Sequence, residues 1–388
     1  MNIAGNIWKL QADRFFSNFW LHIAILVPFF ESNGLSATQI FLTETIFAVV
    51  TALSEIPTGY LSDVIGRKKC FVIGSALIPV SMTVYAFSHT FWAFAGAETI
   101  MGIALAFRSG TDSSFLYDTL LELKREKEHK RIEGTALFLR EIGSGIANIL
   151  GGLLATISLT LPFVVNVFTS LVLLPLALAT KEPKRESSQS QNAKAHAKDM
   201  GRTVLYCAKH PILRNATLYM ALINGLGIIG YWMEYLLYSK IGITVTYFGF
   251  LAATCSLMTA LGSKALHPLD KKMGERFALA LPLFMGTCMV AIGLLQSLWS
   301  LPFVFLNSFL WGLSIPLLRD ILHKNTGSSI RATVLSVTSM SGRLVFIAFS
   351  AGMGHLIDLT NIQTGFLCLG SLFLVTTALP AMGLMRAR

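Results

Sequence analysis

The sequence predicts an all-α membrane protein: two pseudo-symmetric six-helix bundles with both termini on the cytoplasmic side. Three observations predict this class: a very apolar composition, a series of long apolar runs, and one long polar stretch near the middle. Of the 388 residues, 53% are hydrophobic and 13% are charged. Soluble domains are about 25% charged, so this composition argues against an ordinary soluble enzyme.

Twelve apolar runs are each long enough to cross about 30 Å of hydrocarbon as a helix. A helix suits that setting because it satisfies every backbone polar group within its own segment. Because the number of spans is even, both termini are expected on the same side. The predicted spans are residues 12–33, 38–58, 70–88, 91–117, 134–157, 160–180, 213–239, 243–267, 277–296, 299–322, 332–356 and 362–384.

The polar stretch at residues 181–212 is rich in Ser, Gln, Lys and Ala. It predicts a cytoplasmic linker between an N-terminal bundle (1–180) and a C-terminal bundle (213–388). Within it, residues 193–210 fit either a cationic helix lying on the membrane surface or a disordered segment.

The net charge of +10 would also fit a protein that binds nucleic acid. Nearly all lysines and arginines, however, fall on the side shared by the termini and the linker. The exceptions are Lys240, beside an opposite-side loop, and Arg108, Arg140 and Arg343, inside spans. Positive charge concentrates on the cytoplasmic side of membrane proteins. The distribution of the basic residues therefore predicts the orientation of the chain in the membrane, and no nucleic-acid partner is expected.

Several chemistries have no sequence signal. The five cysteines are scattered without a C-x-x-C pair, which argues against a disulfide framework and a cysteine zinc site. No P-loop, H-E-x-x-H or G-x-S-x-G motif occurs. We therefore expect no enzyme activity, cofactor or metal site. The N-terminus lacks a basic region and a cleavage site, so the first apolar run is expected to remain as a span.

Between the second and third spans, residues 59–69 read GYLSDVIGRKK. This segment resembles the signature loop of the major facilitator superfamily, G-x-x-x-D-x-x-G-R-[RK], and residues 269–276 form a weaker copy in the second half. The resemblance implies a secondary transporter whose loop residues latch its cytoplasmic side. The alternative is a tight loop anchored by positive charge. The gate residues expected from the resemblance and the neighbouring charges are Asp63, Arg67, Lys68, Asp118, Arg140 and Arg331.

The fifth span resembles the efflux-antiporter pattern of this superfamily only in part. Its glycines Gly134, Gly143, Gly151 and Gly152 have the expected spacing and would permit close packing across the interface of the halves. The central Gly-Pro, however, is Ala-Asn at residues 147–148. In the fourth span, the antiporters' R-x-x-x-G appears with Glu98 in place of the arginine. Both departures argue against drug antiport.

Ionisable groups inside a membrane are costly and need a partner, a water-filled cavity or a function. Arg14, Asn18 and His22 are four residues apart and are expected on one face of the first span. A hydrogen-bonded, uncharged histidine is the alternative for His22, and an ion pair with Asp112 is the alternative for Arg108. Arg343, in the middle of span 11, is expected to meet an acid or an anionic solute. The candidate cavity residues are Asn18, His22, Arg108, Asn148, Asn224 and Arg343.

Acidic residues within or beside the spans are candidates for carrying a coupling proton. They are Glu44, Glu55, Glu98, Asp112 and Glu141. The absence of a nucleotide motif leaves an ion gradient or the solute's own gradient as the drive.

The expected function is proton-coupled export of a small organic solute, such as an anionic metabolite, a siderophore-like chelator or a drug. The alternative is proton-linked or facilitative uptake of a nutrient. A lipid flippase, or a scaffold or receptor without transport, is an alternative of another class. The expected setting is a monomer in the bilayer of a bacterial inner membrane, with the solute and protons as its partners.

Overall fold

The computed structural model describes residues 3–109, 111–183, 193–295, 297–326 and 331–386. Every regular element in these ranges is a helix, which confirms the predicted all-α class. Within the ranges, some side chains are outside the description: residues 56, 63, 112–113, 130, 193–200, 266–279, 319–320, 323–324, 331–332 and 385–386.

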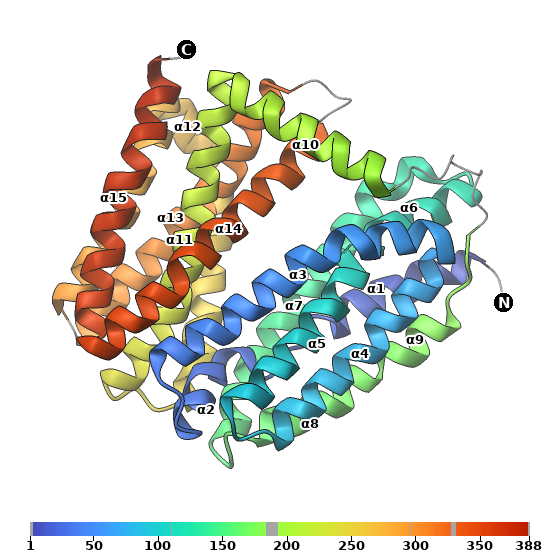
Figure 1. Cartoon of the computed structure of the whole chain (residues 1–388), viewed down its shortest axis with the longest axis horizontal. Coiled ribbons are helices and arrows are strands. Elements are labelled where there is room, and N and C mark those ends of the chain that lie inside the picture. Colours follow the sequence, from blue (N-terminus) through green and yellow to red (C-terminus); the bar gives the residue numbers. More distant parts are fainter. Residues whose placement is uncertain (1–2, 110, 184–192, 296, 327–330, 387–388) are drawn as a thin grey trace. The chain divides into compact units, whose positions relative to one another are not determined.

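Residues 1–34, 46–197 and 245–250 form one compact unit, here called unit 1 (Figure 1). Within it, α4 packs against α5, α8 and α9, and α1 packs against α7 and α9. Its elements are η1 (Ile3–Gly5), α1 (Asn6–Phe16), η2 (Ile23–Ile25), α2 (Leu26–Ser32), most of α3 (Ala37–Ile65), α4 (Arg67–Phe87), α5 (Phe91–Ser109), α6 (Asp112–Glu122), η3 (Glu126–Glu128), α7 (His129–Ala155), α8 (Leu161–Leu171) and α9 (Leu173–Ala179).

Residues 35–45, 198–244 and 251–388 form unit 2. Its central helix is α11, which packs against α13, α14 and α15. The elements of this unit include most of α10 (Ala193–Lys209), α11 (Pro211–Lys240), most of α12 (Thr246–Leu295), η4 (Leu298–Ser300), α13 (Leu301–Lys324), α14 (Arg331–Leu359) and α15 (Ile362–Arg386).

Three helices, α3, α10 and α12, begin in one unit and continue in the other. The first residues of α3 belong to unit 2, where the Asp358 carboxylate of α14 accepts hydrogen bonds from the backbone N–H groups of Ala37 (2.8 Å) and Thr38 (2.9 Å). Deeper along the same pair of helices, the Thr45 and Ser350 hydroxyls are 2.6 Å apart.

The beginning of α12 belongs in the same way to unit 1. A Cβ on Gly249 would lie only 2.1 Å from the backbone oxygen of Asn148 on α7. A Cβ on Gly152 would lie 2.8 Å from the backbone oxygen of Thr246. Glycine is therefore needed on both helices for this close approach.

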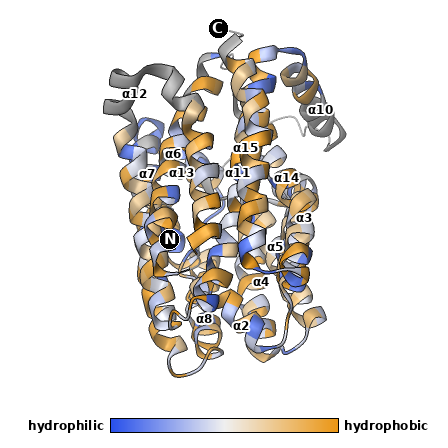
Figure 2. Cartoon of the chain, turned by 90° about the vertical axis from the view of Figure 1, so that its left-hand side faces the viewer, coloured by the Kyte–Doolittle hydropathy of each residue, from blue (hydrophilic) through white to orange (hydrophobic). Residues whose placement is uncertain are grey.

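Hydrophobic residues cover most of the length of the helices (Figure 2). In the described part of the chain, nine helices are long and apolar enough to cross a membrane. Two shorter apolar helices, Ile23–Ser32 and Ala280–Leu295, fall on the predicted spans 12–33 and 277–296. The total of twelve spans and the orientation of the termini stay predictions.

Two local predictions were wrong. The span at 12–33 is divided, because regular helix is interrupted between Phe16 and Ile23. The turn expected at residues 268–276 does not occur in the backbone, because α12 continues from Thr246 to Leu295. Its sequence there, PLDKKMGER, contains Pro268 and Gly274, which have low helix propensity, and nothing in the described residues explains the continuity. In the linker, residues 193–209 form the helix α10, and its position on the membrane surface stays a prediction.

Candidate functional site

One side chain of α8 stabilises the non-helical backbone at residues 17–22, where the first span is interrupted. The amide of Asn166 accepts a hydrogen bond from the backbone N–H of Leu21 (2.8 Å) and donates one to the carbonyl of Phe19 (3.1 Å). These backbone groups lack helical partners, so a buried amide that provides both an acceptor and a donor stabilises them. The predicted helical stripe of Arg14, Asn18 and His22 is therefore wrong.

Two glycines of α7 make room for this segment. A Cβ on Gly151 would lie 1.8 Å from the backbone oxygen of Leu21, and a Cβ on Gly143 would lie 2.7 Å from that of Phe15. Any side chain at these positions would displace the first span. These two glycines of the antiporter-like pattern therefore serve packing inside unit 1.

The interrupted segment borders a cavity of about 400 Å³ within unit 1. Pockets for small molecules usually measure roughly 300–1,000 Å³ and combine apolar walls with a few polar groups. Here the walls come from α1, η2, α5, α7 and the interrupted segment. The lining residues are Arg14, Ser17, Asn18, Trp20, Ile23, Leu105, Arg108, Ser109 and Ser144.

Arg108, at the end of α5, is paired with an acid of the first helix. Its guanidinium forms a buried ion pair with the Asp13 carboxylate, and the two side chains are 3% and 2% exposed. Nη1 also donates to the Ser75 hydroxyl at 2.7 Å, and the guanidinium lies over the Phe71 ring, 4.8 Å from its centroid. A buried charge needs such partners because desolvation is costly. The side chain of Asp112, the predicted partner, lies outside the described residues.

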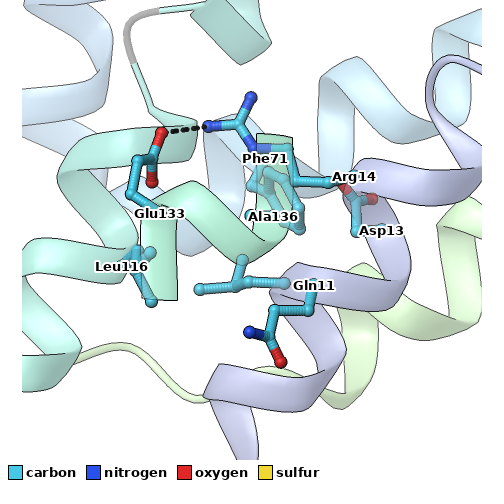
Figure 3. Close-up of a pocket in the computed structure, with 8 residues that line it drawn as sticks. Gln11, Asp13, Arg14, Phe71, Leu116, Glu133 and Ala136 are labelled. Carbon is cyan, nitrogen blue, oxygen red and sulfur yellow. Dashed lines mark ion pairs between the residues drawn. The ribbon is translucent and has the colours of Figure 1, made fainter. Parts of the chain in front are cut away.

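A second arginine of the lining, Arg14, points toward Glu133 of α7 (Figure 3). Their charged atoms are 3.5 Å apart, and both side chains are about one fifth exposed. The two arginines that border the cavity thus each face a carboxylate.

A buried chain of contacts connects α5 to the interrupted segment. The Tyr85 hydroxyl donates a hydrogen bond to the Glu98 carboxylate, and the Tyr85 ring lies 6.0 Å from the His22 ring. The His22 Nδ1 is 3.0 Å from the Asn166 amide oxygen. Glu98, Tyr85, His22 and Asn166 are all at most 5% exposed. A change in the position of the Glu98 side chain can therefore be transmitted through these packed side chains to the backbone beside the cavity.

The family model of the Major Facilitator Superfamily matches residues 15–351 of this sequence. The chain belongs to the major facilitator superfamily. It is accordingly an integral membrane protein of a transporter family and not an enzyme, as its sequence predicted.

Two curated relatives support this assignment. An uncharacterized MFS-type transporter, MJ1560 of Methanocaldococcus jannaschii, is 26% identical over 258 residues, which cover 65% of this chain and 64% of the relative. The uncharacterized MFS-type transporter EfpA of Mycobacterium tuberculosis is 32% identical over 131 residues, or 33% of this chain and 24% of EfpA. The chain thus spans under two thirds of the length of either relative.

Solved structures of superfamily members share the fold at low sequence identity. A point mutant of the nucleoside transporter NupG has a TM-score of 0.80 at 12% identity, with complete coverage of both chains. A bacterial homologue of the human lysosomal transporter Spinster, in an inward-facing and unoccupied conformation, has a TM-score of 0.72 at 16% identity. The match covers 99% of this chain and 95% of that one. A D-xylose–proton symporter has a TM-score of 0.69 at 13% identity, and the match covers 96% of this chain and 95% of the symporter.

The superfamily signature loop is held within unit 1. Arg67 donates from Nε to Asp118 Oδ2 at 2.6 Å. The carboxylate of Glu182, just past α9, accepts hydrogen bonds from the backbone N–H groups of Arg67 (2.9 Å) and Lys68 (2.7 Å). Gly66 precedes them with a φ of +105°, a conformation that favours glycine. The loop therefore joins α4, α6 and the first residues of the linker.

Two predicted gate residues, Asp63 and Arg331, and the predicted proton carrier Asp112 have side chains outside the described residues. Arg140 and Glu141 form an exposed ion pair with each other at 2.6 Å, and Arg67 pairs with Asp118. Asn148 is buried on α7.

In unit 2, Asn224 on α11 lies opposite Gly342, with its Cβ 3.2 Å from where a Cβ on that glycine would stand. Its neighbour Arg343 is half-buried on α14. On α3, Glu44 is buried and Glu55 is half-buried.

Among the residues of this site that the sequence did not predict are Asp13, Trp20, Ser75 and Asn166. Asp13 alone carried a signal, because it is an acid at the boundary of an apolar run. Asn166 is a single amide in an apolar helix, and only its position opposite residues 19–22 gives it a role.

Proposed function

We propose that this protein moves a small polar organic solute across the membrane by alternating access, and that the unit 1 cavity forms part of its solute site. One observation carries the proposal: the first span is interrupted where it borders the cavity. Irregular backbone at membrane depth is tolerated where it is buried in protein or lines a water-filled cavity, and transporters place their solute sites at such discontinuities.

We further propose that transport is coupled to protons through Glu98. A carboxylate that binds a proton becomes neutral and changes its hydrogen bonding with a neighbouring hydroxyl, here that of Tyr85. The contacts from Tyr85 through His22 to Asn166 would transmit that change to the interrupted segment. This chain of contacts favours Glu98 over Glu141, whose side chain is 64% exposed in its pair with Arg140.

For the direction of transport, we propose uptake by proton symport. Gly143 and Gly151, which favoured export in the sequence, are explained by their contacts with the first span. One structural neighbour is named as a D-xylose–proton symporter, and another as a nucleoside transporter. Export is the second candidate, favoured by the antiporter-like spacing that Gly134, Gly143, Gly151 and Gly152 retain.

The remaining parts of the proposal concern topology and setting. We propose a monomer in a bacterial inner membrane, with an N-terminal bundle at 1–180, a cytoplasmic linker at 181–212 and a C-terminal bundle at 213–388. Both termini would then face the cytoplasm, in accord with the positive-inside rule.

Purified protein in proteoliposomes tests these proposals, with radiolabelled adenosine and D-xylose as first probes. Under symport, an inward acid-outside pH gradient accelerates uptake of a transported probe, and under antiport an acid-inside gradient does so. We expect Glu98→Gln to lose the response to the pH gradient but to retain exchange of labelled for unlabelled solute. Glu141→Gln, in the exposed pair, serves as the matched control and should behave as the wild type.

If Glu98→Gln responds to the pH gradient as the wild type does, coupling through this residue is wrong. If a broader panel of small solutes shows no flux, a scaffold or receptor role gains support. Flux of fluorescent lipid between leaflets, without solute flux, would instead indicate a flippase.

A further inference from the structure

Trp20 is the one aromatic residue among the described residues that line the unit 1 cavity, and its ring is fixed in place. The indole N–H donates a hydrogen bond to the backbone carbonyl of Ser17. The ring is stacked on His22 at an interplanar angle of 24°, with 5.5 Å between centroids. Because His22 contacts Asn166 at 3.0 Å, the whole stack is anchored to α8.

Four polar residues of the cavity lining have short, uncharged side chains. Ser17, Asn18, Ser109 and Ser144 bring hydroxyl and amide groups to the lining. Such groups both donate and accept hydrogen bonds, so they match a solute that carries both kinds of group. Ile23 and Leu105 add apolar surface to the lining.

The charged residues of the lining are already compensated. Arg108 is ion-paired with the buried carboxylate of Asp13, and Arg14 lies 3.5 Å from Glu133. An anionic solute would have to compete with these carboxylates, and a cationic one would meet the two guanidinium groups. The electrostatics of the cavity therefore favour a solute without net charge.

We propose that the cavity recognises an uncharged solute with a planar, hydrogen-bonding ring, which packs against Trp20. This inference rests on the proposed transport function and narrows its substrate class. It replaces the anionic solute that the sequence favoured. Base-like rings stack on aromatic side chains whatever their substituents, so Trp20 would supply affinity and the polar rim would supply selectivity.

Equilibrium binding to the purified, detergent-solubilised full chain tests the inference without requiring transport. The probes, measured by titration calorimetry at pH 7.5, form matched pairs. Nicotinamide is compared with nicotinate, which has the same ring and one negative charge, and adenosine is compared with AMP and with ribose. We expect at least one neutral ring compound to bind about tenfold or more tightly than its charged and ring-free counterparts.

The variants separate stacking from general packing. Trp20→Leu should weaken binding of the neutral ring compound by about tenfold or more, and Trp20→Phe, which keeps a flat ring, should retain binding within about threefold. Trp92→Leu, at a tryptophan that is 79% exposed, should bind as the wild type does. Size-exclusion profiles identify any misfolded variant, and the order of probes on the wild type still decides the question if Trp20→Leu does not fold.

Tighter binding of nicotinate or AMP than of their neutral partners would overturn the inference, as would unchanged binding by a folded Trp20→Leu. Binding of neutral rings without flux in proteoliposomes would contradict the proposed transport function but leave this site intact. Flux of other solutes, together with no preference for neutral rings, would leave the transport function standing and refute the substrate class.

Discussion

At the residue scale, Arg108, which lines the cavity, forms a buried ion pair with Asp13. The guanidinium also contacts the Ser75 hydroxyl and the Phe71 ring. A buried pair is often replaceable as a whole, whereas removal of one partner leaves an uncompensated charge. The contribution of this pair is therefore best measured by comparing single and double variants.

We predict that Asp13→Asn destabilises the protein by about 3–5 kcal/mol, because it leaves the Arg108 charge without its carboxylate. The double variant Asp13→Asn, Arg108→Met should recover part of that loss. Thermal unfolding in detergent measures both effects. Arg140→Gln is the control, because Arg140 and Glu141 form an exposed pair with side-chain exposures of 40% and 64%. This variant should change the unfolding temperature little. A double variant less stable than Asp13→Asn would contradict this account.

At the element scale, the interrupted first span depends on helices far away in the sequence. Asn166 of α8 satisfies its backbone, and α7 approaches it through Gly143 and Gly151. The hydrophobic pattern alone predicts a continuous helix there, since residues 12–33 are mostly apolar. The interruption forms because tertiary contacts replace the lost helical hydrogen bonds.

We predict that Gly151→Ala lowers the unfolding temperature and abolishes transport, because its Cβ would lie 1.8 Å from the Leu21 carbonyl oxygen. Gly145→Ala on the same helix is the matched control, since the described residues place no neighbouring atom within 4 Å of its added Cβ. Alanine has the better helix propensity by about 1 kcal/mol, so the control should be neutral or slightly stabilising. Equal effects of the two substitutions would show that the close approach has no role.

At the scale of the whole molecule, α3 and α12 each belong to both compact units. Alternating access requires some of the contacts at such helices to break and re-form in each cycle. The pairing of α3 with α14 is a suitable place to test this, because Thr45 and Ser350 meet there at 2.6 Å between their hydroxyl oxygens.

We predict that a disulfide between Thr45→Cys and Ser350→Cys blocks transport under oxidising conditions, and that a reductant restores it. The experiment uses a background in which the five native cysteines are replaced by serine or alanine. Flux of a transported probe in proteoliposomes is the measurement, and each single cysteine variant is the control. Undiminished flux in a fully cross-linked sample would rule out opening at this contact.

Local properties of the amino-acid sequence predicted the membrane class, the positions of most long helices and the family. These follow from local properties of the chain: apolar runs long enough to cross a bilayer, and a signature loop whose glycines and charges are adjacent. The same local evidence placed the beginnings of α3, α4, α5, α11, α13, α14 and α15 within about three residues of where the structure has them.

The construction of the cavity depends on contacts between residues that are far apart in the sequence. Arg108 meets Asp13 across 95 residues of sequence, and Leu21 meets Asn166 across 145. Periodicity within one helix predicted an Arg14–Asn18–His22 stripe because it assumes unbroken helix geometry. That assumption fails here because a buried amide from another helix satisfies the backbone. The chain therefore lacks a regular helical turn where it borders the cavity beside Trp20.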